Sequence, residues 1–313
     1  MTNGGPRVAV IGSVNYDVAV RSERFPEAGE TVSGVGSSLS AGGKGANQAV
    51  QAALLGAEVT FVAKVGDDAF AGASLASLAE AGLDTSHVVT EADTPTGIAV
   101  IWLDLSGENR IVVAPNANAR LSAADVDAAA DAIAASAAVL IQFEVPDAVI
   151  VRAAEVARDH GVPLVLNPAP PRTMPEPALG QTAWLVANRG EAKAISGVTP
   201  ADERSLALAA AAIREQGPRG VVITLGDGGA FVDDGSSPEL IPAVAVERVV
   251  DTTAAGDAFA AAFTVGIAEG SNPAAAAAFG AAAGAVAVSR AGAQSSLGSR
   301  PEVERAMRLR SSA

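Results

Sequence analysis

The stretch AAVLIQFEVPDAVIVRAAEVARDHGVPLVLN (137–167) contains a complete strand, helix and strand pattern. Its two apolar runs, AAVLIQF (137–143) and PLVLN (163–167), have the length and β-branched content of buried strands. Segment 147–159 between them carries apolar residues at helical spacing, and Gly161 follows as a helix-ending glycine. This pattern predicts two parallel strands joined by a helix that packs on one face of the sheet.

The same alternation continues along most of the chain. Further strand-like runs lie at 7–12, 59–66, 183–188 and 220–226, and helical spacing is found at 45–55, 72–81, 122–135 and 203–216. Such an alternation is typical of a mostly parallel sheet with helices on both faces. We therefore predict an α/β fold built as a three-layer α/β/α sandwich, with residues 1–313 forming a single domain.

Two segments break this alternation. Segment 16–40 is rich in Gly, Ser and Val, and in TGIAVIWLDLSGENRIVVA (96–114) two strand-like runs flank SGEN, which predicts a hairpin. We expect the two segments to form a small β-sheet lid over the carboxyl ends of the main strands, where α/β sheets bind ligands. The alternative is an ordinary extension of the main sheet at its edge.

Composition excludes several classes of function. The chain has 313 residues, of which 49% are hydrophobic and 18% charged, and it has no cysteine, which rules out disulfides, thiolate metal sites and Cys nucleophiles. No apolar run is long enough to cross a membrane, and the first residues lack the features of a signal peptide, so we expect a cytoplasmic location. The net charge of −14 opposes binding to nucleic acids and acidic membranes. His87 lies in a polar connection and His160 at a helix end, so both are expected to be structural.

The stretch DTTAAGDAF (251–259) predicts an anion site at the start of a helix. Phe259, Phe263 and Ile267 follow at i, i+4 and i+8, which places the first turn near Ala255–Asp257. The small residues Ala254, Ala255 and Gly256 leave the unpaired N–H groups of that turn open to an anion. A carboxylate beside an anion site is unfavourable unless it accepts a proton from an attacking hydroxyl, so Asp257 indicates phosphoryl transfer. The alternative is an ordinary acidic residue early in a helix.

A second polar set fits a sugar. SAGGKGANQAV (40–50) is a glycine-rich turn that enters a helix, but Gly45 after Lys44 excludes a Walker A loop, and 7–17 has no GxGxxG fingerprint. The first strand is expected to end in Asn15 and Asp17, whose side chains then point the same way. The expected sugar-binding donors and acceptors are Asn15, Asp17, Lys44, Asn47 and Glu144. Each of these residues is also common in turns and caps, which is the alternative.

Short motifs occur along roughly 7–297. They are GSVNYD (12–17), FPEAGETV (25–32), AGGKGANQA (41–49), GDD (66–68), TGIAVIWLD (96–104), Asn188–Glu191, VITLGDGGA (222–230), DTTAAGDAF (251–259) and SRAGAQSS (289–296). Through them the chain resembles the ribokinase family of sugar kinases, also called the PfkB family. The resemblance implies an ATP-dependent kinase that phosphorylates the 5-hydroxyl of D-ribose to give D-ribose 5-phosphate and ADP.

The resemblance also implies a role for each matching residue. Asp257 would be the base, and the N–H groups of Ala254, Ala255 and Gly256 would stabilise the transferring phosphoryl group. Ribose would be bound by Asn15, Asp17, Gly43, Lys44, Gly45, Ala46, Asn47 and Glu144. ATP would be bound by Asn188, Thr224, Leu225, Gly226, Asp227, Gly228, Gly229, Gly256 and Ala281. Asn188 and Glu191 would hold Mg²⁺ through water, and Asp251, Thr253, Ala287, Arg290, Gly292 and Ser296 would hold K⁺, largely through backbone carbonyls. The family resemblance further implies a homodimer joined through the lids.

Three positions depart from the family pattern. Ala187, Asn188 and Arg189 stand where Pro–Asn–Glu is usual, Tyr16 replaces a smaller residue, and Ala281 stands where Asn or His is usual near the base. Tyr16 keeps open a kinase for another furanose or a nucleoside, such as deoxyribose, fructose or adenosine. A catalytically silent sugar-binding regulator is the alternative from another class. It would need no general base, so Asp257 argues against it.

Overall fold

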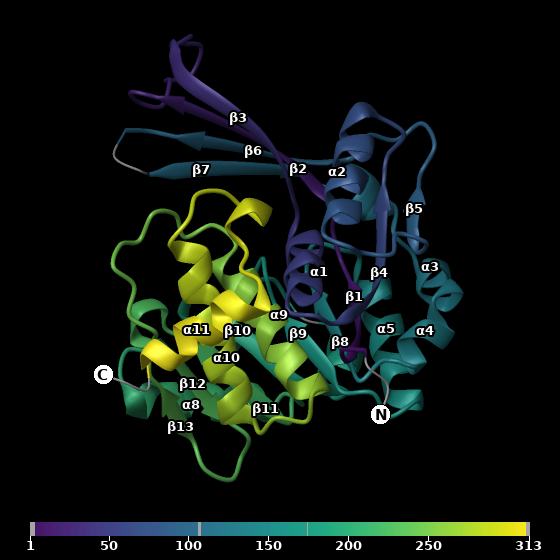
Figure 1. Cartoon of the computed structure of the whole chain (residues 1–313), viewed down its shortest axis with the longest axis vertical. Helices are drawn as coiled ribbons and strands as arrows, with labels where there is room; N and C mark the ends of the chain where they lie inside the picture. The colour runs from purple at the N-terminus through teal and green to yellow at the C-terminus, as the bar shows by residue number, and fades with distance from the viewer. Residues whose placement is uncertain (1–3, 106–107, 174, 311–313) are drawn as a thin grey trace.

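The computed structural model describes residues 4–105, 108–173 and 175–310, and within them nine strands form one sheet (Figure 1). In their order across the sheet they are β13 (Glu239–Ile241), β12 (Ala230–Asp233), β11 (Gly220–Thr224), β10 (Thr182–Asn188), β9 (Leu164–Asn167), β8 (Ala138–Gln142), β1 (Arg7–Ile11), β4 (Glu58–Val65) and β5 (Val88–Thr90). From β5 to β11 all neighbouring strands are parallel, whereas β12 and β13 are antiparallel additions at one edge. The six strands predicted from apolar runs are all present.

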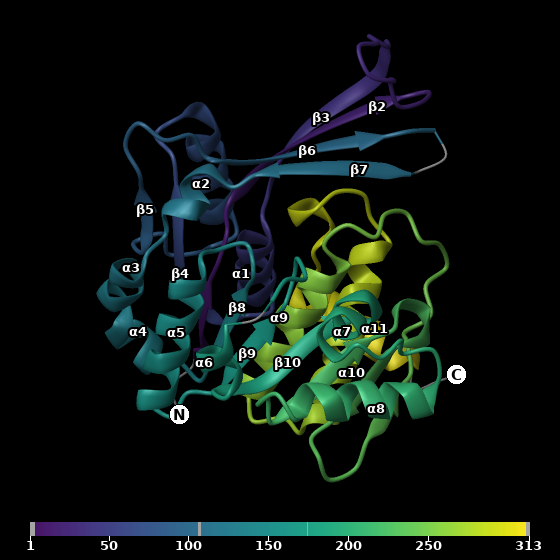
Figure 2. The same cartoon turned by 180° about the vertical axis from the view of Figure 1, so that it is seen from behind.

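Helices cover both faces of this sheet, which confirms the three-layer sandwich (Figures 1 and 2). One face packs on α1 (Lys44–Leu54), α2 (Ala69–Glu80), α9 (Ala255–Ala268), α10 (Pro273–Val288) and α11 (Arg300–Arg310). The other packs on α3 (Ala123–Ala128), α4 (Ala130–Ala134), α5 (Asp147–Asp159), α6 (Glu176–Leu179), α7 (Arg189–Ser196) and α8 (Glu203–Arg214). Alternate residues of a strand face opposite sides, so Val8 and Val10 join the first core and Ala9 and Ile11 the second.

A second, four-stranded sheet forms the lid. It has the order β3 (Gly34–Gly42), β2 (Asn15–Ser22), β6 (Gly97–Leu103) and β7 (Asn109–Ala114). The predicted hairpin is confirmed because β6 and β7 pair antiparallel, although Ser106 and Gly107 of its predicted turn lie outside the described residues. Because only three residues separate β1 from β2, the lid begins at the carboxyl end of a central strand (Figure 1).

Two details of the predicted elements are wrong. Asn15 and Asp17 do not end the first strand: β1 stops at Ile11, and both residues belong to β2 of the lid. Segment 122–135 is not one helix but two, α3 and α4. The ladder is interrupted where the Ala129 N–H bonds to Val126 O, three residues back, as in a 3₁₀ turn.

The alanine-rich segment 272–288 is helical from Pro273 to Val288. Asn272 caps α10 by accepting a hydrogen bond from Ala275 N (2.8 Å), and Pro273 occupies the first helical position. A Cβ added at Gly280 would lie 3.0 Å from Phe259 O. This glycine therefore allows α10 to approach closely to α9, which carries Asp257.

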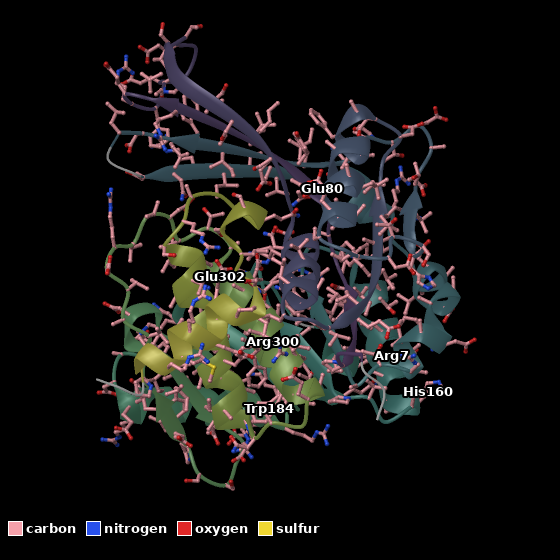
Figure 3. The ribbon with its side chains drawn as sticks, in the orientation of Figure 1. Arg7, Glu80, His160, Trp184, Arg300 and Glu302 are labelled. Atoms are coloured by element: carbon pink, nitrogen blue, oxygen red, sulfur yellow. The ribbon has the colours of Figure 1, made fainter. Side chains whose placement is uncertain are left out.

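His160 lies far from the lid, at the opposite end of the molecule (Figure 3). It follows α5 directly as the C-cap residue, at the helix end that the sequence predicts. Among the described residues, no helix combines the length and the apolar character needed to cross a bilayer.

Candidate active site

The start of α9 forms one part of the candidate site. Ala254, the residue before the helix, has a left-handed backbone (φ 59°) and no side-chain cap. The Ala255 N–H is directed to Thr252 O (3.3 Å), whereas the N–H groups of Gly256 and Asp257 belong to the first turn and have no acceptor earlier in the helix. A Cβ at Gly256 would meet nothing within 4 Å. This turn therefore offers open N–H groups at the positive end of the helix.

Asp257 is buried behind this turn, with 6% of its surface exposed. Its two carboxylate oxygens accept hydrogen bonds from two successive residues of α1, Asn47 Nδ2 to Oδ2 (2.9 Å) and Gln48 Nε2 to Oδ1 (3.0 Å). The negative charge of Asp257 is the main cause that raises the pKa of Lys44 above its ordinary value, against the effect of burial. The carboxylate therefore lies next to the glycine-rich turn, as the predicted constellation requires.

Glu144 connects the remaining residues of the sugar set. It follows β8, and its Oε2 accepts hydrogen bonds from Ser13 Oγ (2.5 Å), Lys44 N (3.2 Å) and Asn15 Nδ2 (3.4 Å). Asn15 Oδ1 in turn accepts from Asn118 Nδ2 (2.8 Å). The predicted residues Asn15, Lys44 and Glu144 are thus in direct contact.

Asp17 shares the charge field of this cluster. Burial raises the pKa of Asp17 to about 6, the negative charges of Glu144 and Asp257 add to the shift, and Lys44 opposes it. Asp17 of β2 therefore lies close enough to Glu144 and Asp257 for their charges to act on its carboxyl group.

N–H groups of the glycine-rich turn donate hydrogen bonds to other parts of the protein. Gly43 precedes α1 with φ 92°, the Gly45 N–H donates to Ser13 Oγ (3.3 Å), and the Ala46 N–H donates to Ser13 O (2.9 Å). These contacts fix the start of α1 against the turn that follows β1. Of the predicted sugar-binding residues, Gly45 and Ala46 therefore use their N–H groups within the protein.

A cavity of about 920 Å³ reaches the start of α9, where Ala255 and Gly256 line it. From the predicted nucleotide set it is lined by Asn188, Thr224, Leu225, Gly226, Asp227, Gly229, Gly256 and Ala281. Gly228 belongs to the same turn, Gly226–Gly228. The rest of the lining is mostly apolar and comes from Val244, Val246, Val249, Phe259, Ala285 and Val288. The cavity and the cluster of predicted sugar-binding residues meet at the start of α9, where Gly256 lines the cavity and Asp257 contacts Asn47.

The predicted magnesium residues are engaged with each other. Asn188 Oδ1 accepts from Glu191 N (2.8 Å), and Glu191 Oε2 accepts from Asn188 N (2.9 Å), which is a capping box at the start of α7. Burial raises the pKa of Glu191. Among the described residues no group of three or more His, Cys, Asp or Glu forms a metal cluster. The donors present fit a hydrated Mg²⁺ that keeps most of its water, and not a fully ligated ion.

The predicted potassium residues are brought together only in part. Asp251 Oδ1 accepts from Thr253 N (2.9 Å) and Thr253 Oγ1 (2.7 Å), and Asp251 Oδ2 accepts from Gly292 N (3.0 Å). The Arg290 guanidinium pairs with Glu302, and Ser296 Oγ donates to Ala293 O. Ala287 O accepts the Arg290 N–H (3.2 Å). Asp251, Thr253 and Gly292 therefore form one hydrogen-bonded corner, while the side chains of Arg290 and Ser296 face other partners.

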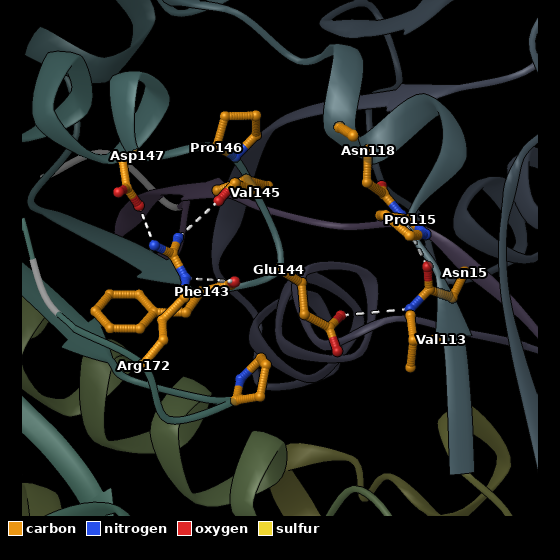
Figure 4. Close-up of a pocket in the computed structure, with 12 residues that line it drawn as sticks. Asn15, Val113, Pro115, Asn118, Phe143, Glu144, Val145, Pro146, Asp147 and Arg172 are labelled. Carbon is orange, nitrogen blue, oxygen red and sulfur yellow. Dashed lines mark hydrogen bonds and ion pairs between the residues drawn. The ribbon is translucent and has the colours of Figure 1, made fainter. Parts of the chain in front are cut away.

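A smaller cavity of about 400 Å³ opens beside Asn15 and Glu144 (Figure 4). Val113 from the lid strand β7 lines one part of it. At another part, Arg172 lies over the Phe143 ring (4.7 Å) and pairs with Asp147. The predicted sugar-binding residues Asn15 and Glu144 therefore share a cavity with both the lid and the carboxyl end of β8.

Sequence reasoning missed several polar residues of this site. Ser13 and Asn118 hold Glu144 and Asn15, and Gln48, Gln142 and Asn167 lie below Asp257. Gln48 stands inside the motif AGGKGANQA, so its position in that motif was the available signal. Ser13 likewise stands inside the motif GSVNYD (12–17). Asn118, Gln142 and Asn167 are single polar residues for which the sequence offers no distinguishing pattern.

Comparison with known proteins agrees with this geometry. The family model described as pfkB family carbohydrate kinase matches residues 6–300. The chain is 39% identical over 295 residues to a ribokinase of Haemophilus influenzae, covering 94% of this chain and 96% of that protein. It is also 39% identical over 297 residues to a Bacillus subtilis ribokinase, with 95% and 98% covered. Its structure is similar to that of Arabidopsis thaliana ribokinase complexed with ribose and ATP, with a TM-score of 0.91, 31% identity, and 97% and 99% of the two chains covered. The chain belongs to the pfkB family of carbohydrate kinases.

Proposed function

We propose that this carbohydrate kinase transfers the γ-phosphoryl group of ATP to the 5-hydroxyl of D-ribose, giving D-ribose 5-phosphate and ADP. The observation that carries the proposal is the placement of Asp257. Its carboxylate is held by the side-chain amides of Asn47 and Gln48, while Ala255 and Gly256 of the same helix turn line the large cavity. The names of the relatives, which are ribokinases, support the choice of ribose.

The sugar side offers acceptors for several neighbouring hydroxyls. Asn47 Oδ1 is buried and has no hydrogen-bond partner within the described residues, although its Nδ2 is used by Asp257. A buried acceptor without a partner is costly, and a ligand hydroxyl would satisfy it. In the proposed complex Asn15, Asp17, Lys44, Asn47 and Glu144 bind ribose.

The chemical step needs a base on one side of the transferred group and positive charge on the other. In the proposed mechanism Asp257 takes the proton of the 5-hydroxyl, and the N–H groups of Gly256 and its neighbours stabilise charge on the phosphoryl oxygens. Asn188, Thr224 and the turn Leu225–Gly229 hold the nucleotide. The apolar end of the cavity, which includes Ala281, binds the adenine of the nucleotide.

Two ions belong to this proposal. Bound Mg²⁺ would supply positive charge at the phosphates, with Asn188 and Glu191 orienting its water. K⁺ at the corner of Asp251, Thr253 and Gly292 would order the loop that leads into α9. Equal rates in K⁺ and in a large organic cation would contradict the second assignment.

We also propose a homodimer joined through the lids. On one face of the lid sheet, the side chains of Leu39, Val100 and Val112 lie in register across neighbouring strands and are exposed. An exposed apolar patch on a sheet is a favourable surface for association. The molar mass in solution, measured by light scattering, tests this; a monomer at all concentrations would contradict it.

The experiment that tests the function is a coupled assay of ADP release. Ribose, deoxyribose, fructose and adenosine are compared, with and without K⁺, and the product is identified by ³¹P NMR. We expect ribose to give the highest kcat/KM and a 5-phosphate. A higher kcat/KM for another furanose or a nucleoside would replace ribose as the substrate, and no ADP release with any sugar would favour a silent sugar-binding regulator.

Tyr16, which kept the nucleoside alternative open, stacks on Phe70 of α2, with the two ring centroids 4.7 Å apart.

A further inference from the structure

Gln48 is fully buried on α1 and uses its whole amide in hydrogen bonds. Its Nε2 donates both to Asp257 Oδ1 (3.0 Å) and to Asn167 Oδ1 (3.0 Å), and its Oε1 accepts from Gln142 Nε2 (2.5 Å). A primary amide has two donor hydrogens and one acceptor oxygen. Gln48 therefore has no donor left over for a ligand.

The direction of this amide is fixed by its neighbours. Asn167 Nδ2 donates to Val186 O (2.9 Å), so Asn167 must present its oxygen to Gln48. If the Gln48 amide were turned over, its oxygen would face the oxygens of both Asn167 and Asp257. That arrangement would leave three buried acceptors without donors, which is strongly unfavourable.

The chain of amides connects Asp257 to the main sheet. Gln142 ends β8, Asn167 ends β9, and the two residues are register partners. Val186 lies on β10. Hence one oxygen of Asp257 is tied, through Gln48, to the carboxyl ends of three parallel strands.

We propose that Gln48 is a positioning residue for Asp257, and this inference rests on the proposed function. Asn47 holds Oδ2 of the carboxylate and Gln48 holds Oδ1. With one of the two donors the carboxylate can rotate about its Cβ–Cγ bond; with both, its plane is fixed. Gln48 sets the direction in which Asp257 presents its free lone pairs to the sugar hydroxyl, and it does not itself contact the sugar.

A matched control exists one turn further along α1. Gln51 is also fully buried, but its Nε2 donates to Gly298 O (2.8 Å) and its Oε1 accepts from Gly298 N (3.3 Å). The variants Gln48→Met and Gln51→Met remove equal amide groups and keep the side-chain length. A purely structural effect of losing a buried amide would appear in both.

Steady-state kinetics of the two variants test the proposal. We expect Gln48→Met to lower kcat by about 10- to 100-fold, because a misdirected base loses its near-attack geometry. The KM for ribose should change by less than about threefold, since the sugar-contacting groups remain. Gln51→Met should keep kcat within about twofold. Equal kcat values in the two variants would overturn the proposal.

A double variant separates positioning from a general structural effect. In the Asp257→Asn background, Gln48→Met should change the residual turnover by less than about twofold, because the group it positions is gone. The same fold loss in both backgrounds would mean that Gln48 acts independently of Asp257, and would overturn the proposal. Full turnover in Asp257→Asn alone would instead contradict the proposed function.

If Gln48→Met does not fold, Gln142→Met replaces it in the test. This change removes only the donor to Gln48 Oε1, and Gln142 Oε1 already has no partner among the described residues. We expect kcat to fall about threefold to tenfold, as Gln48 becomes free to move. An unchanged kcat in a folded Gln142→Met protein would overturn the proposal.

Discussion

The two sides of the candidate active site, the proposed sugar side and the proposed nucleotide side, use glycine for opposite reasons. On the sugar side, a Cβ at Gly45 would lie 2.4 Å from Ser13 N and 2.5 Å from Gly12 C, so protein backbone occupies the space. On the nucleotide side, a Cβ at Gly256 would meet nothing within 4 Å. The first glycine allows one part of the protein to contact another, and the second leaves room for a ligand. A glycine-rich motif therefore indicates close approach, but only the structure tells whether protein or ligand approaches.

The polar groups differ in the same way. The proposed sugar side holds Glu144 and Asp257 by hydrogen bonds from side-chain amides and a hydroxyl, and the charges of both carboxylates act on the nearby Asp17. Much of the nucleotide cavity is apolar, with residues such as Val246 and Ala281 in its lining. We infer that the sugar is selected by fixed hydrogen bonds and the base mainly by shape.

Replacing Gly45 should destabilise the fold and thereby disrupt the proposed sugar side. Gly45→Ala is expected to lower the free energy of unfolding by about 3 kcal/mol or more, because backbone atoms cannot yield to the added methyl group. Urea denaturation followed by circular dichroism measures this. Gly72→Ala in α2 is the control, since a Cβ at Gly72 would meet nothing within 4 Å and should change stability by no more than about 1 kcal/mol. Equal stability of the two variants would contradict the contrast.

Replacing Gly256 should spare the fold and impair the chemistry. Gly256→Ala is expected to keep or slightly raise stability, because alanine favours a helix more than glycine does. Its methyl group would reduce the approach of the phosphate to the N–H groups, and we expect kcat/KM for ATP to fall about tenfold or more. Thermal unfolding and ADP-release kinetics on the same sample test both parts. Unaltered kinetics would place the phosphate elsewhere.

Acid should weaken the binding of ribose. Because burial and neighbouring carboxylates raise the pKa of Asp17 to about 6, Asp17 gains a proton as the pH falls through that value. Protonated Asp17 is a poorer acceptor, so the Kd of ribose should rise about tenfold between pH 7 and pH 5. Calorimetry of ribose binding without nucleotide measures this. In Asp17→Asn the pH dependence should be lost, and if it persists another group is responsible.

Changing the nucleobase of the phosphate donor should have the smallest effect on kcat/KM. In the apolar part of the cavity, few side chains can distinguish the polar edges of adenine from those of guanine. GTP in place of ATP should therefore lower kcat/KM by less than about tenfold. Removing a sugar hydroxyl, as in deoxyribose, should cost more, because buried acceptors lose their donor. The loss of kcat/KM for deoxyribose is compared with the loss for GTP. A larger loss for GTP would contradict the contrast between the two sides.

Most of the fold was predictable because its signals are local. Apolar runs such as AAVLIQF and spacing such as that of 147–159 depend on neighbours in sequence, and both elements are present. Asn15 and Asp17 were assigned to the wrong strand because the exit of the chain from β1 depends on contacts of residues 12–14 with α1 and β4. Such contacts join residues far apart in the chain.

The candidate site was predictable in part. Asp257, Lys44, Asn47 and Glu144 are brought together as expected. The amides below Asp257 were not predicted, because Gln142 and Asn167 become neighbours of Gln48 only when β8, β9 and α1 pack. Alternation of strands and helices predicts where polar residues emerge from a sheet, but not which of them hydrogen-bond beneath it.

The central claim is that Asp257 activates the sugar hydroxyl beside the open start of α9. The most direct test measures the turnover of Asp257→Asn together with its binding of ribose and ATP by calorimetry. We expect turnover to fall by about 10³-fold or more, because the base is lost, while both dissociation constants stay within about threefold of the wild-type values. Undiminished turnover with intact binding would contradict the account.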